Sequence, residues 1–248
     1  MLLALSPSQL QHNLFNKLMD ASKQNLISIS DLMDKIRIHS CSGKGAAAFL
    51  RTPAAAQGGF FTNAAFKIAV KIRINAPLQL LSPSQCICGD NLDDFGFHLF
   101  KCRRGGEWDA RHSSLVQCIA SIIRSTDIAV QHEVPLANLG PLRSLDRNGT
   151  GRMDLVFTSS DFQNILADVT VTHPFPADIG AFTPPMSSPL HFTKSTELRK
   201  KTRYSHAARQ INRNFIPFAF ETFGASGPSF DVSLKTLANR YQRLISWN

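Results

Sequence analysis

The chain of 248 residues is long enough to bury a hydrophobic core, and its 43% of apolar residues is ordinary for a globular protein. No apolar run reaches the length of a membrane span, and the short apolar patch at the start lacks a basic flank, so we expect neither a membrane protein nor a secreted one. Lysine and arginine (27) outnumber the acidic residues (18), and the net charge of +9 favours a polyanionic partner. We expect the protein in the nucleus or the cytoplasm.

Residues 1–82 are predicted to form a helical extension. Apolar residues recur at helical spacing within residues 1–40, and we expect these helices to be packing elements. Residues 41–59 and 76–85 predict loops. Residues 60–75 interleave apolar and basic side chains, which favours a basic amphipathic helix over a strand. Its basic face is explained as well by solvent exposure as by nucleic-acid contact.

Residues 83–106 carry a dense set of potential metal ligands. The spacing is C-x-C-x9-H-x3-C, formed by Cys86, Cys88, His98 and Cys102. Three thiolates and one imidazole make a closed structural site for Zn²⁺, and two glycines in the segment permit tight turns. The first spacer is shorter than in most zinc motifs, and the alternative is three buried free thiols beside a surface histidine. Asp93 and Asp94 have no apolar strand around them, so we do not interpret them as a polymerase carboxylate pair.

Basic residues surround the boundary between this zinc knuckle and the next predicted domain, residues 107–248. Arg103 and Arg104 follow the last cysteine. The domain opens with an amphipathic helix of about four turns, in which apolar residues recur at 3-and-4 spacing. Arg111 and His112 lie in its first turn, where they would meet phosphate or, by default, solvent.

Three strands are predicted after this helix. Their sequences are AVQHEVPL (129–136), GRMDLVF (151–157) and ILADVTV (165–171), with a hairpin turn between the last two. Because alternate residues of a strand share a face, each of the last two strands has an apolar face and a face that bears one aspartate. Met153, for example, should share a face with Leu155. Asp154 and Asp168 are thus expected side by side, with Glu133 of the first strand as a weaker third acid.

The rest of the chain is predicted as a proline-rich loop, a helix, a strand and a final helix, over residues 172–193, 194–211, 216–224 and 231–247. A stripe on the first of these helices should face the sheet, and it includes Tyr204. Both Lys200 and Lys201 are compatible with that stripe, and periodicity does not separate them. On the final helix, residues such as Leu237 and Tyr241 should point inward.

Acidic residues in apolar strands are costly unless something binds them, so Asp154 and Asp168 are the strongest functional signal. Two adjacent carboxylates on rigid strands suit Mg²⁺ or Mn²⁺, and a nearby lysine would orient a water for hydrolysis. In a basic protein, the matching substrate is a nucleic-acid backbone. The alternative is a structural ion pair between either aspartate and an arginine, for which the candidates are Arg152, Arg199 and Arg203.

The combined order of these motifs resembles the PD-(D/E)xK restriction-endonuclease superfamily. More narrowly, the C-x-C…H…C knuckle, then RH at a helix start, V-x-x-E, R-x-D-L-V, D-V-T-V and K-x-x-R-Y are similar to the restriction-like endonuclease that ends the open reading frames of site-specific non-LTR retrotransposons. The match covers roughly residues 86–224. The N-terminal stretch more loosely resembles the linker that follows the reverse transcriptase in such polyproteins.

Two positions depart from the superfamily pattern. Met153 stands where the motif has proline, and Thr170 stands where it has lysine. In the retrotransposon enzymes the lysine is understood to have moved to the following helix, and the resemblance assigns that role to Lys200. The implied fold is a restriction-endonuclease-like α/β core (helix, three strands, helix, strand, helix), preceded by the zinc knuckle and the helical extension.

The resemblance also implies roles for the remaining residues. Asp154 and Asp168 would bind Mg²⁺ or Mn²⁺, with the Val169 carbonyl as a further ligand, while Lys200 aligns the attacking water and Glu133 assists. The expected DNA contacts are Arg103, Arg104, Arg111, His112, Arg203 and Tyr204. DNA is the expected partner, with RNA as a further candidate and no membrane.

The function implied is a Mg²⁺-dependent endonuclease that nicks a target DNA strand, working with a reverse transcriptase encoded upstream or supplied in trans. One alternative is a non-catalytic remnant that binds zinc and nucleic acid. Another is a cellular resolvase or repair nuclease of the same superfamily.

Overall fold

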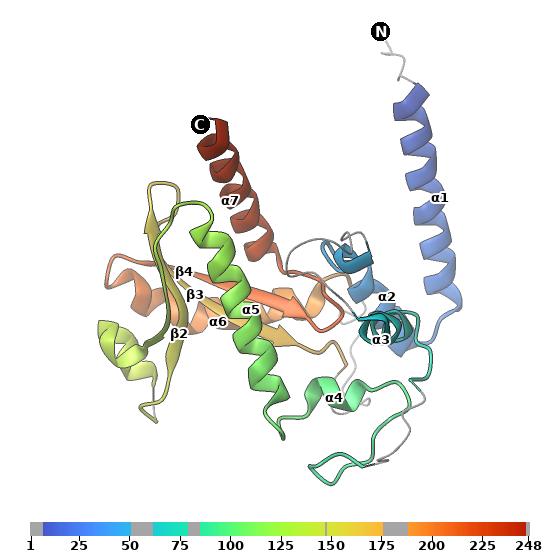
Figure 1. The fold of residues 1–248 in the computed structure, drawn as a ribbon, viewed down its shortest axis with the longest axis horizontal. Helices are drawn as coiled ribbons and strands as arrows, with labels where there is room; N and C mark the ends of the chain where they lie inside the picture. The colour runs from blue at the N-terminus through green and yellow to red at the C-terminus, as the bar shows by residue number, and fades with distance from the viewer. Residues whose placement is uncertain (1–6, 51–61, 79–84, 147, 176–187, 247–248) are drawn as a thin grey trace.

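A computed structural model describes residues 7–50, 62–78, 85–146, 148–175 and 188–246. Within these ranges the protein has a four-stranded mixed sheet with helices on both faces (Figure 1). The strands are β1 (Val130–Pro135), β2 (Arg152–Ser159), β3 (Gln163–Thr172) and β4 (Asn214–Glu221). The predicted α/β class is therefore confirmed. None of the described helices is both long and apolar enough to cross a bilayer.

The sheet follows chain order, β1-β2-β3-β4. The first three strands are antiparallel, so the predicted hairpin between β2 and β3 is present. β4 runs parallel to β3 and is reached through the crossover helix α6 (His191–Arg209). Pairing between β2 and β3 runs from Ser159 and Gln163 to Leu155 and Ala167 and stops there, so β2 leaves β3 just before the two aspartates.

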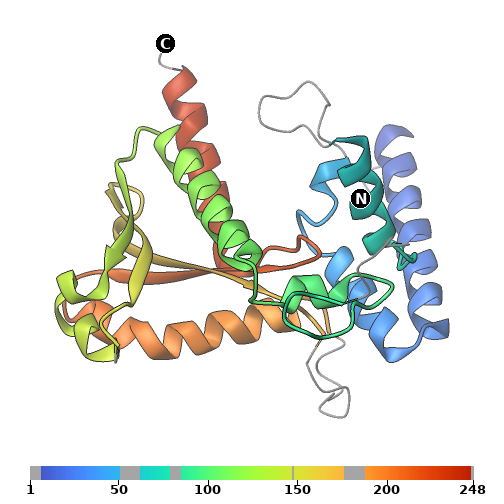
Figure 2. The ribbon, with the colours of Figure 1, turned by 60° about the horizontal axis from the view of Figure 1, so that its bottom comes forward.

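Helices cover the two faces of the sheet, as Figure 2 shows. On one face, α5 (Glu107–Arg124) and α7 (Pro228–Ser246) pack on the sheet; this core cluster includes Ile119, Ile123, Leu155, Phe157, Val169, Phe218 and Leu237. On the other face lies α6, and its cluster includes Tyr204, Ala208, Val156, Leu166 and Phe215. Because successive side chains of a strand point to opposite faces, the apolar residues of β2 and β3 contribute to both clusters.

The alternation fails at the start of β2. Met153 is fully buried with Val156 and Leu166 on the α6 face, so the prediction that it shares the face of Leu155 is wrong. β2 has no partner in β3 at this point, but it still pairs with β1, where Val134 opposes Met153. The preceding residue of β1, Glu133, has a left-handed backbone (φ 56°) and is missing from the register opposite Asp154. This irregularity between Met153 and Leu155 interrupts the pleat, so the alternation of faces does not continue through it.

Two short 3₁₀ helices, η2 (Leu136–Asn138) and η3 (Gly140–Leu145), connect β1 to β2. Their leucines, Leu136, Leu139 and Leu142, complete the cluster beneath α6. The predicted strands and the two long C-terminal helices occur where the sequence indicates, with ends shifted by a few residues. Residues 176–187 of the predicted proline-rich loop lie outside the described residues.

The N-terminal part contains α1 (Pro7–Ile29), α2 (Leu32–Cys41), η1 (Ala48–Leu50) and α3 (Asn63–Arg73). The prediction of a helix rather than a strand in residues 60–75 is confirmed. A third cluster joins this part to the rest of the molecule: Ile36 and Cys41 of α2 pack with Phe175 and Phe223 from the ends of β3 and β4. Phe97 of the knuckle packs against the same cluster.

Two apolar stripes do not pack as predicted. Leu14 and Leu18 of α1 are 53% and 66% exposed, and α1 stands away from the sheet (Figure 1). In α7, Leu237 is buried but Tyr241 is 46% exposed, because the second half of the helix extends past the sheet. Periodicity identifies the apolar side of a helix, but only the tertiary fold determines whether another element covers it.

Candidate metal centres

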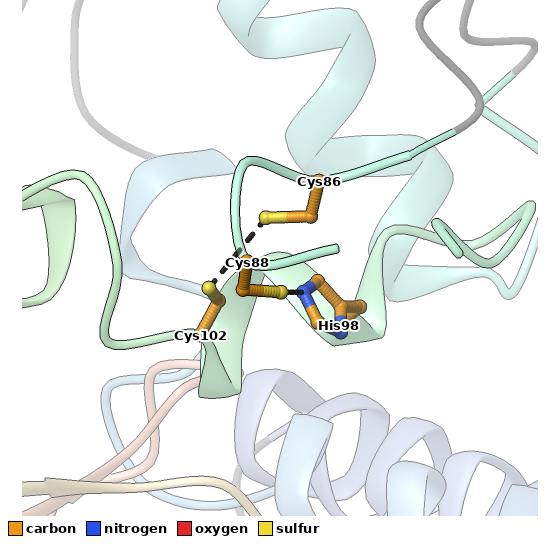
Figure 3. A group of neighbouring side chains, drawn as sticks. All are labelled: Cys86, Cys88, His98 and Cys102. Carbon is orange, nitrogen blue, oxygen red and sulfur yellow. Dashed lines mark hydrogen bonds between the residues drawn. The ribbon is translucent and has the colours of Figure 1, made fainter. Parts of the chain in front are cut away.

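The four predicted zinc ligands converge in space (Figure 3). The Sγ atoms of Cys86 and Cys102 are 3.5 Å apart, and Cys88 Sγ lies 3.3 Å from His98 Nε2. All four ligand atoms lie within 4.8 Å of one another. In a tetrahedral site with Zn–S bonds of about 2.3 Å, sulfur atoms are about 3.8 Å apart, so the set has the right size for Zn²⁺.

The local sequence explains this convergence. Gly89 and Gly96 have φ angles of 95° and 75°, a left-handed conformation that glycine adopts at little cost, and they form the turns that the sequence predicts. The Asp93 carboxylate accepts hydrogen bonds from the backbone N–H groups of Phe95, Phe97 and His98, which fixes the start of α4 (Phe97–Lys101). Asp93 is thus a helix-capping residue, in agreement with the rejection of a polymerase pair.

The electrostatics of the knuckle differ between its thiols: the pKa of Cys88 is raised to about 11, because the lowering effect of the backbone N–H of Asp90 is outweighed by desolvation and the neighbouring thiols, whereas that of Cys86 is lowered. The backbone N–H of Cys88 donates to the Cys86 sulfur and lowers the pKa of this thiol to about 7, which favours the thiolate that metals bind. The other ring nitrogen of His98, Nδ1, lies 3.9 Å from a carboxylate oxygen of Asp90. At this distance the two groups are electrostatic neighbours without a hydrogen bond.

The knuckle is docked on the sheet through aromatic rings. Phe97 meets Phe175 edge to face with the ring centroids 4.8 Å apart, and Phe100 stacks on His173 at 5.6 Å. His173 Nδ1 lies 2.6 Å from the Thr222 hydroxyl oxygen, while its Nε2 has no hydrogen-bond partner among the described residues. Burial, with a smaller effect of nearby cations, lowers the pKa of His173 to about 3. The imidazole is therefore neutral in the folded protein at ordinary pH.

The second centre lies at the point where β2 leaves β3. Asp168 of β3 is only 7% exposed, and Lys200 Nζ lies 3.0 and 2.7 Å from its two carboxylate oxygens. Thr170 Oγ1 donates a third hydrogen bond to it. Burial raises the pKa of Asp168, and the charge of Asp154 raises it further, while the Lys200 ammonium acts in the opposite direction. The expectation that the two aspartates lie side by side stays a prediction, because the group of ligand atoms within 4.8 Å that contains Asp154 does not include Asp168.

The structure separates the two lysines that periodicity could not. Lys201 Nζ lies 3.0 Å from Ser229 Oγ and 3.7 Å from Glu197 Oε2, at the start of α7. Lys200 is the residue that reaches Asp168. The alternative of a structural pair with arginine does not describe Asp168, because its charged partner is this lysine.

Asp154 has a different set of contacts. Its Oδ2 accepts the backbone N–H of Val169 at 2.5 Å and lies 3.4 Å from His112 Nε2. The same imidazole nitrogen lies 3.0 Å from the Val169 carbonyl oxygen. The N–H and C=O of one strand residue point to the same edge. Side chains of Asp154 and His112 therefore occupy the edge of β3 that β2 has left.

Glu133 joins this group, as the sequence suggested, but next to His112 rather than in a simple row of acids. Ligand atoms of His112, Glu133 and Asp154 all lie within 4.8 Å of one another. They come from α5, β1 and β2 and line an open cleft of about 500 Å³, together with Trp108 and Arg152. Hydrogen bonding to Asp154 raises the pKa of His112. This position of His112 beside two carboxylates could not be predicted, since a histidine in the first turn of a helix has no pattern that shows what it faces.

The predicted DNA contacts divide into exposed and interior residues. Arg103, Arg104 and Arg203 are exposed, and Arg103 lies over the ring of Trp108 at 5.4 Å. Arg111 is half-buried and donates to the Phe100 carbonyl at 3.0 Å, so the expectation of solvent exposure is wrong for it and for His112. Tyr204 is 6% exposed and packs on Phe215, which leaves its ring no surface for DNA.

No family model matches this sequence, and neither does any curated protein at a significant level. The functional argument therefore depends on the two centres themselves. The knuckle offers three sulfurs and one nitrogen, the donor set of a structural zinc site. The cleft offers carboxylate oxygens and a carbonyl, which suit Mg²⁺ or Mn²⁺, together with one imidazole, a ligand of transition metals.

Proposed function

We propose that this protein is a DNA endonuclease dependent on Mg²⁺ or Mn²⁺, of the restriction-like type associated with non-LTR retrotransposons, and that its knuckle binds Zn²⁺. The observation that carries the proposal is the contact of the Lys200 ammonium with both oxygens of buried Asp168, on which the charge of Asp154 also acts, at the divergence of β2 and β3. Two acids and a lysine so placed are the minimum needed for metal-assisted hydrolysis of a phosphodiester.

In this proposal each side chain has a defined task. Asp154 and Asp168 hold the cation, with the Val169 carbonyl as a neighbouring donor. The bound cation would supply positive charge to the scissile phosphate. Lys200 donates a hydrogen bond to the attacking water, and its charge opposes the rise in the pKa of Asp168 that burial causes. The arginines on the surface beside the knuckle, Arg103 and Arg104, bind the DNA backbone.

A nicking assay tests the proposal. Supercoiled plasmid is incubated with the zinc-loaded protein and Mg²⁺ or Mn²⁺, and relaxed circles are expected for the wild type but not for Asp154→Ala combined with Asp168→Ala. Asp161→Ala is the matched control, because Asp161 pairs with Arg240 and Arg243 away from the cleft. Equal activity of wild type and double variant rejects the proposal.

The second candidate is a zinc protein that binds nucleic acid without cutting it. It is favoured by the departures from the superfamily motif at Met153 and Thr170, and by the exposed arginines beside the knuckle. This candidate predicts DNA binding that weakens steeply with salt, together with intact plasmid for every variant.

A further inference from the structure

His112 is placed so that one nitrogen atom faces several oxygen atoms. Its Nε2 lies 3.0 Å from the Val169 carbonyl oxygen and 3.4 Å from Asp154 Oδ2, and a carboxylate oxygen of Glu133 lies within the same 4.8 Å group. The oxygens accept hydrogen bonds, so Nε2 must carry the proton in this arrangement. A single N–H is thereby shared between a carbonyl and a carboxylate, with a second carboxylate nearby.

A position surrounded by oxygens and occupied by a proton is one that a cation can take. In an octahedral site with bonds of about 2.1 Å, neighbouring ligand atoms are about 3.0 Å apart. The two distances from His112 Nε2 are close to that value. Binding requires the Nε2 proton to leave to solvent or to move to Nδ1, after which the lone pair of Nε2 faces the cation.

The surroundings hold these donors in place. The ring of Trp108 lies parallel to the His112 imidazole, at an angle of 7° with centroids 6.2 Å apart, on the side of the cleft. Asp154 is fixed by the Val169 N–H. The cleft between α5 and β1 leaves the group accessible to solvent, so an ion and a phosphate can both enter.

We propose that the cation of this protein is bound by His112, Glu133, Asp154 and the Val169 carbonyl, and that the imidazole ligand makes the site prefer Mn²⁺ to Mg²⁺. Mg²⁺ demands oxygen donors, whereas imidazole is a ligand of first-row transition ions, among which Mn²⁺ is the one best suited to the carboxylate and carbonyl oxygens of this group. The remaining positions are open to water, to substrate phosphate and to Asp168. This assignment deepens the proposed function, on which it rests, by adding a nitrogen ligand that the aspartate motif does not contain.

The test measures metal binding without DNA. The full chain, loaded with one equivalent of Zn²⁺ at the knuckle, is titrated with Mn²⁺, and free Mn²⁺ is followed by electron paramagnetic resonance. Pulsed measurements on the bound ion then report whether an imidazole nitrogen is coordinated directly. The variant is His112→Gln, which keeps a polar N–H near the Val169 carbonyl, and the control is His132→Gln, an exposed histidine that lines the same cleft.

We expect one bound Mn²⁺ with a nitrogen signal in the wild type and in His132→Gln. His112→Gln should lose the nitrogen signal and bind Mn²⁺ more weakly by about tenfold or more. Wild-type affinity in His112→Gln overturns the proposal. If that variant does not fold, the wild type alone still decides, because bound Mn²⁺ without a nitrogen signal overturns it equally.

The nicking assay, run in parallel, separates this inference from the proposed function. Intact plasmid with Mn²⁺ bound through His112 would leave the site assignment standing and reject the nuclease. Nicked plasmid with Mn²⁺ bound independently of His112 would do the reverse.

Discussion

The Lys200 ammonium contacts both oxygens of the Asp168 carboxylate, at 3.0 and 2.7 Å, and both groups are largely buried. Breaking a buried pair by removing one partner typically costs about 3–5 kcal/mol, because the remaining charge is left without compensation. The pair therefore contributes to stability as well as to the proposed reaction, and the two contributions must be measured separately.

Lys200→Ala is expected to lower the nicking rate by about 100-fold or more, since the water loses its hydrogen-bond donor. Lys201→Ala, one position away, should retain the rate, because Lys201 faces Ser229 and Glu197. Rates are compared at a temperature where circular dichroism shows both variants folded. Equal loss in both variants would contradict the assignment of Lys200.

Glu197 is a buried acid for which we predict a purely structural role. It is 4% exposed, and it accepts hydrogen bonds from the backbone N–H and the hydroxyl of Ser229 at the start of α7. A carboxylate at a helix N-terminus is stabilising, and Gly227 leaves room for it, since a Cβ there would overlap the carboxylate.

Glu197→Ala should therefore lower the free energy of unfolding by about 2 kcal/mol, measured by urea denaturation. The Mn²⁺ affinity of the folded variant should equal that of the wild type. A loss of Mn²⁺ binding with unchanged stability would show that Glu197 belongs to the metal site instead.

Removal of zinc should loosen the docking of the knuckle. Cys88→Ser leaves three ligands, and the rings of Phe97 and Phe100 then lose the scaffold that holds them on His173 and Phe175. We expect the free energy of unfolding to fall by roughly 2 kcal/mol, which lowers Tm by about 4–8 °C in a protein of this size.

Calorimetry with and without a zinc chelator checks this prediction. Cys118→Ser serves as the control, because Cys118 is an exposed thiol on α5, outside the cluster. If chelator lowers Tm in Cys88→Ser as much as in the wild type, the knuckle is not the zinc site.

The stability of the protein should depend on pH through His173. Its pKa is about 3 when folded and near 6.5 when unfolded. Between these values the unfolded chain binds more protons, so stability falls as the pH falls, by up to ~1.4 kcal/mol per pH unit. The contribution is complete above pH 6.5.

His173→Asn tests this dependence. The amide retains a polar atom near the Thr222 hydroxyl but does not titrate in this range. Urea denaturation at several pH values between 3.5 and 7 should give a flatter profile for the variant than for the wild type, whatever their absolute stabilities. Parallel profiles would assign the acid sensitivity to other groups.

Several elements could be predicted from the sequence because local patterns determine them. Alternation in β2 and β3 showed which residues form strands, and helical spacing showed that α6 turns Tyr204 and Ala208 toward the sheet. The spacing of the three cysteines and the histidine was sufficient to predict that the four knuckle ligands lie together. Such features depend on neighbours within one or two turns or one hairpin.

Other features depend on contacts between distant segments and were not accessible. The hydrogen bond of Lys201 to Ser229 depends on the position of α7 beside α6, which no local pattern predicts. Met153 changes face where the pairing of β2 with β3 has ended and the ladder with β1 is interrupted opposite Asp154, and no local sequence pattern predicts this irregularity. His112 meets Asp154 across 42 positions of chain, a contact that helical periodicity does not encode.

The third hydrophobic cluster has a consequence for how the protein can be divided. It contains Ile36 and Cys41 from the extension, Phe97 from the knuckle, and Phe175 and Phe223 from the ends of the central strands. A shortened chain that started at residue 107 would leave both of the latter phenylalanines in water and would be prone to aggregate. The proposed catalytic unit is thus covered at this end by α2 and the knuckle, and a chain that retains both should aggregate less than one that starts at residue 107.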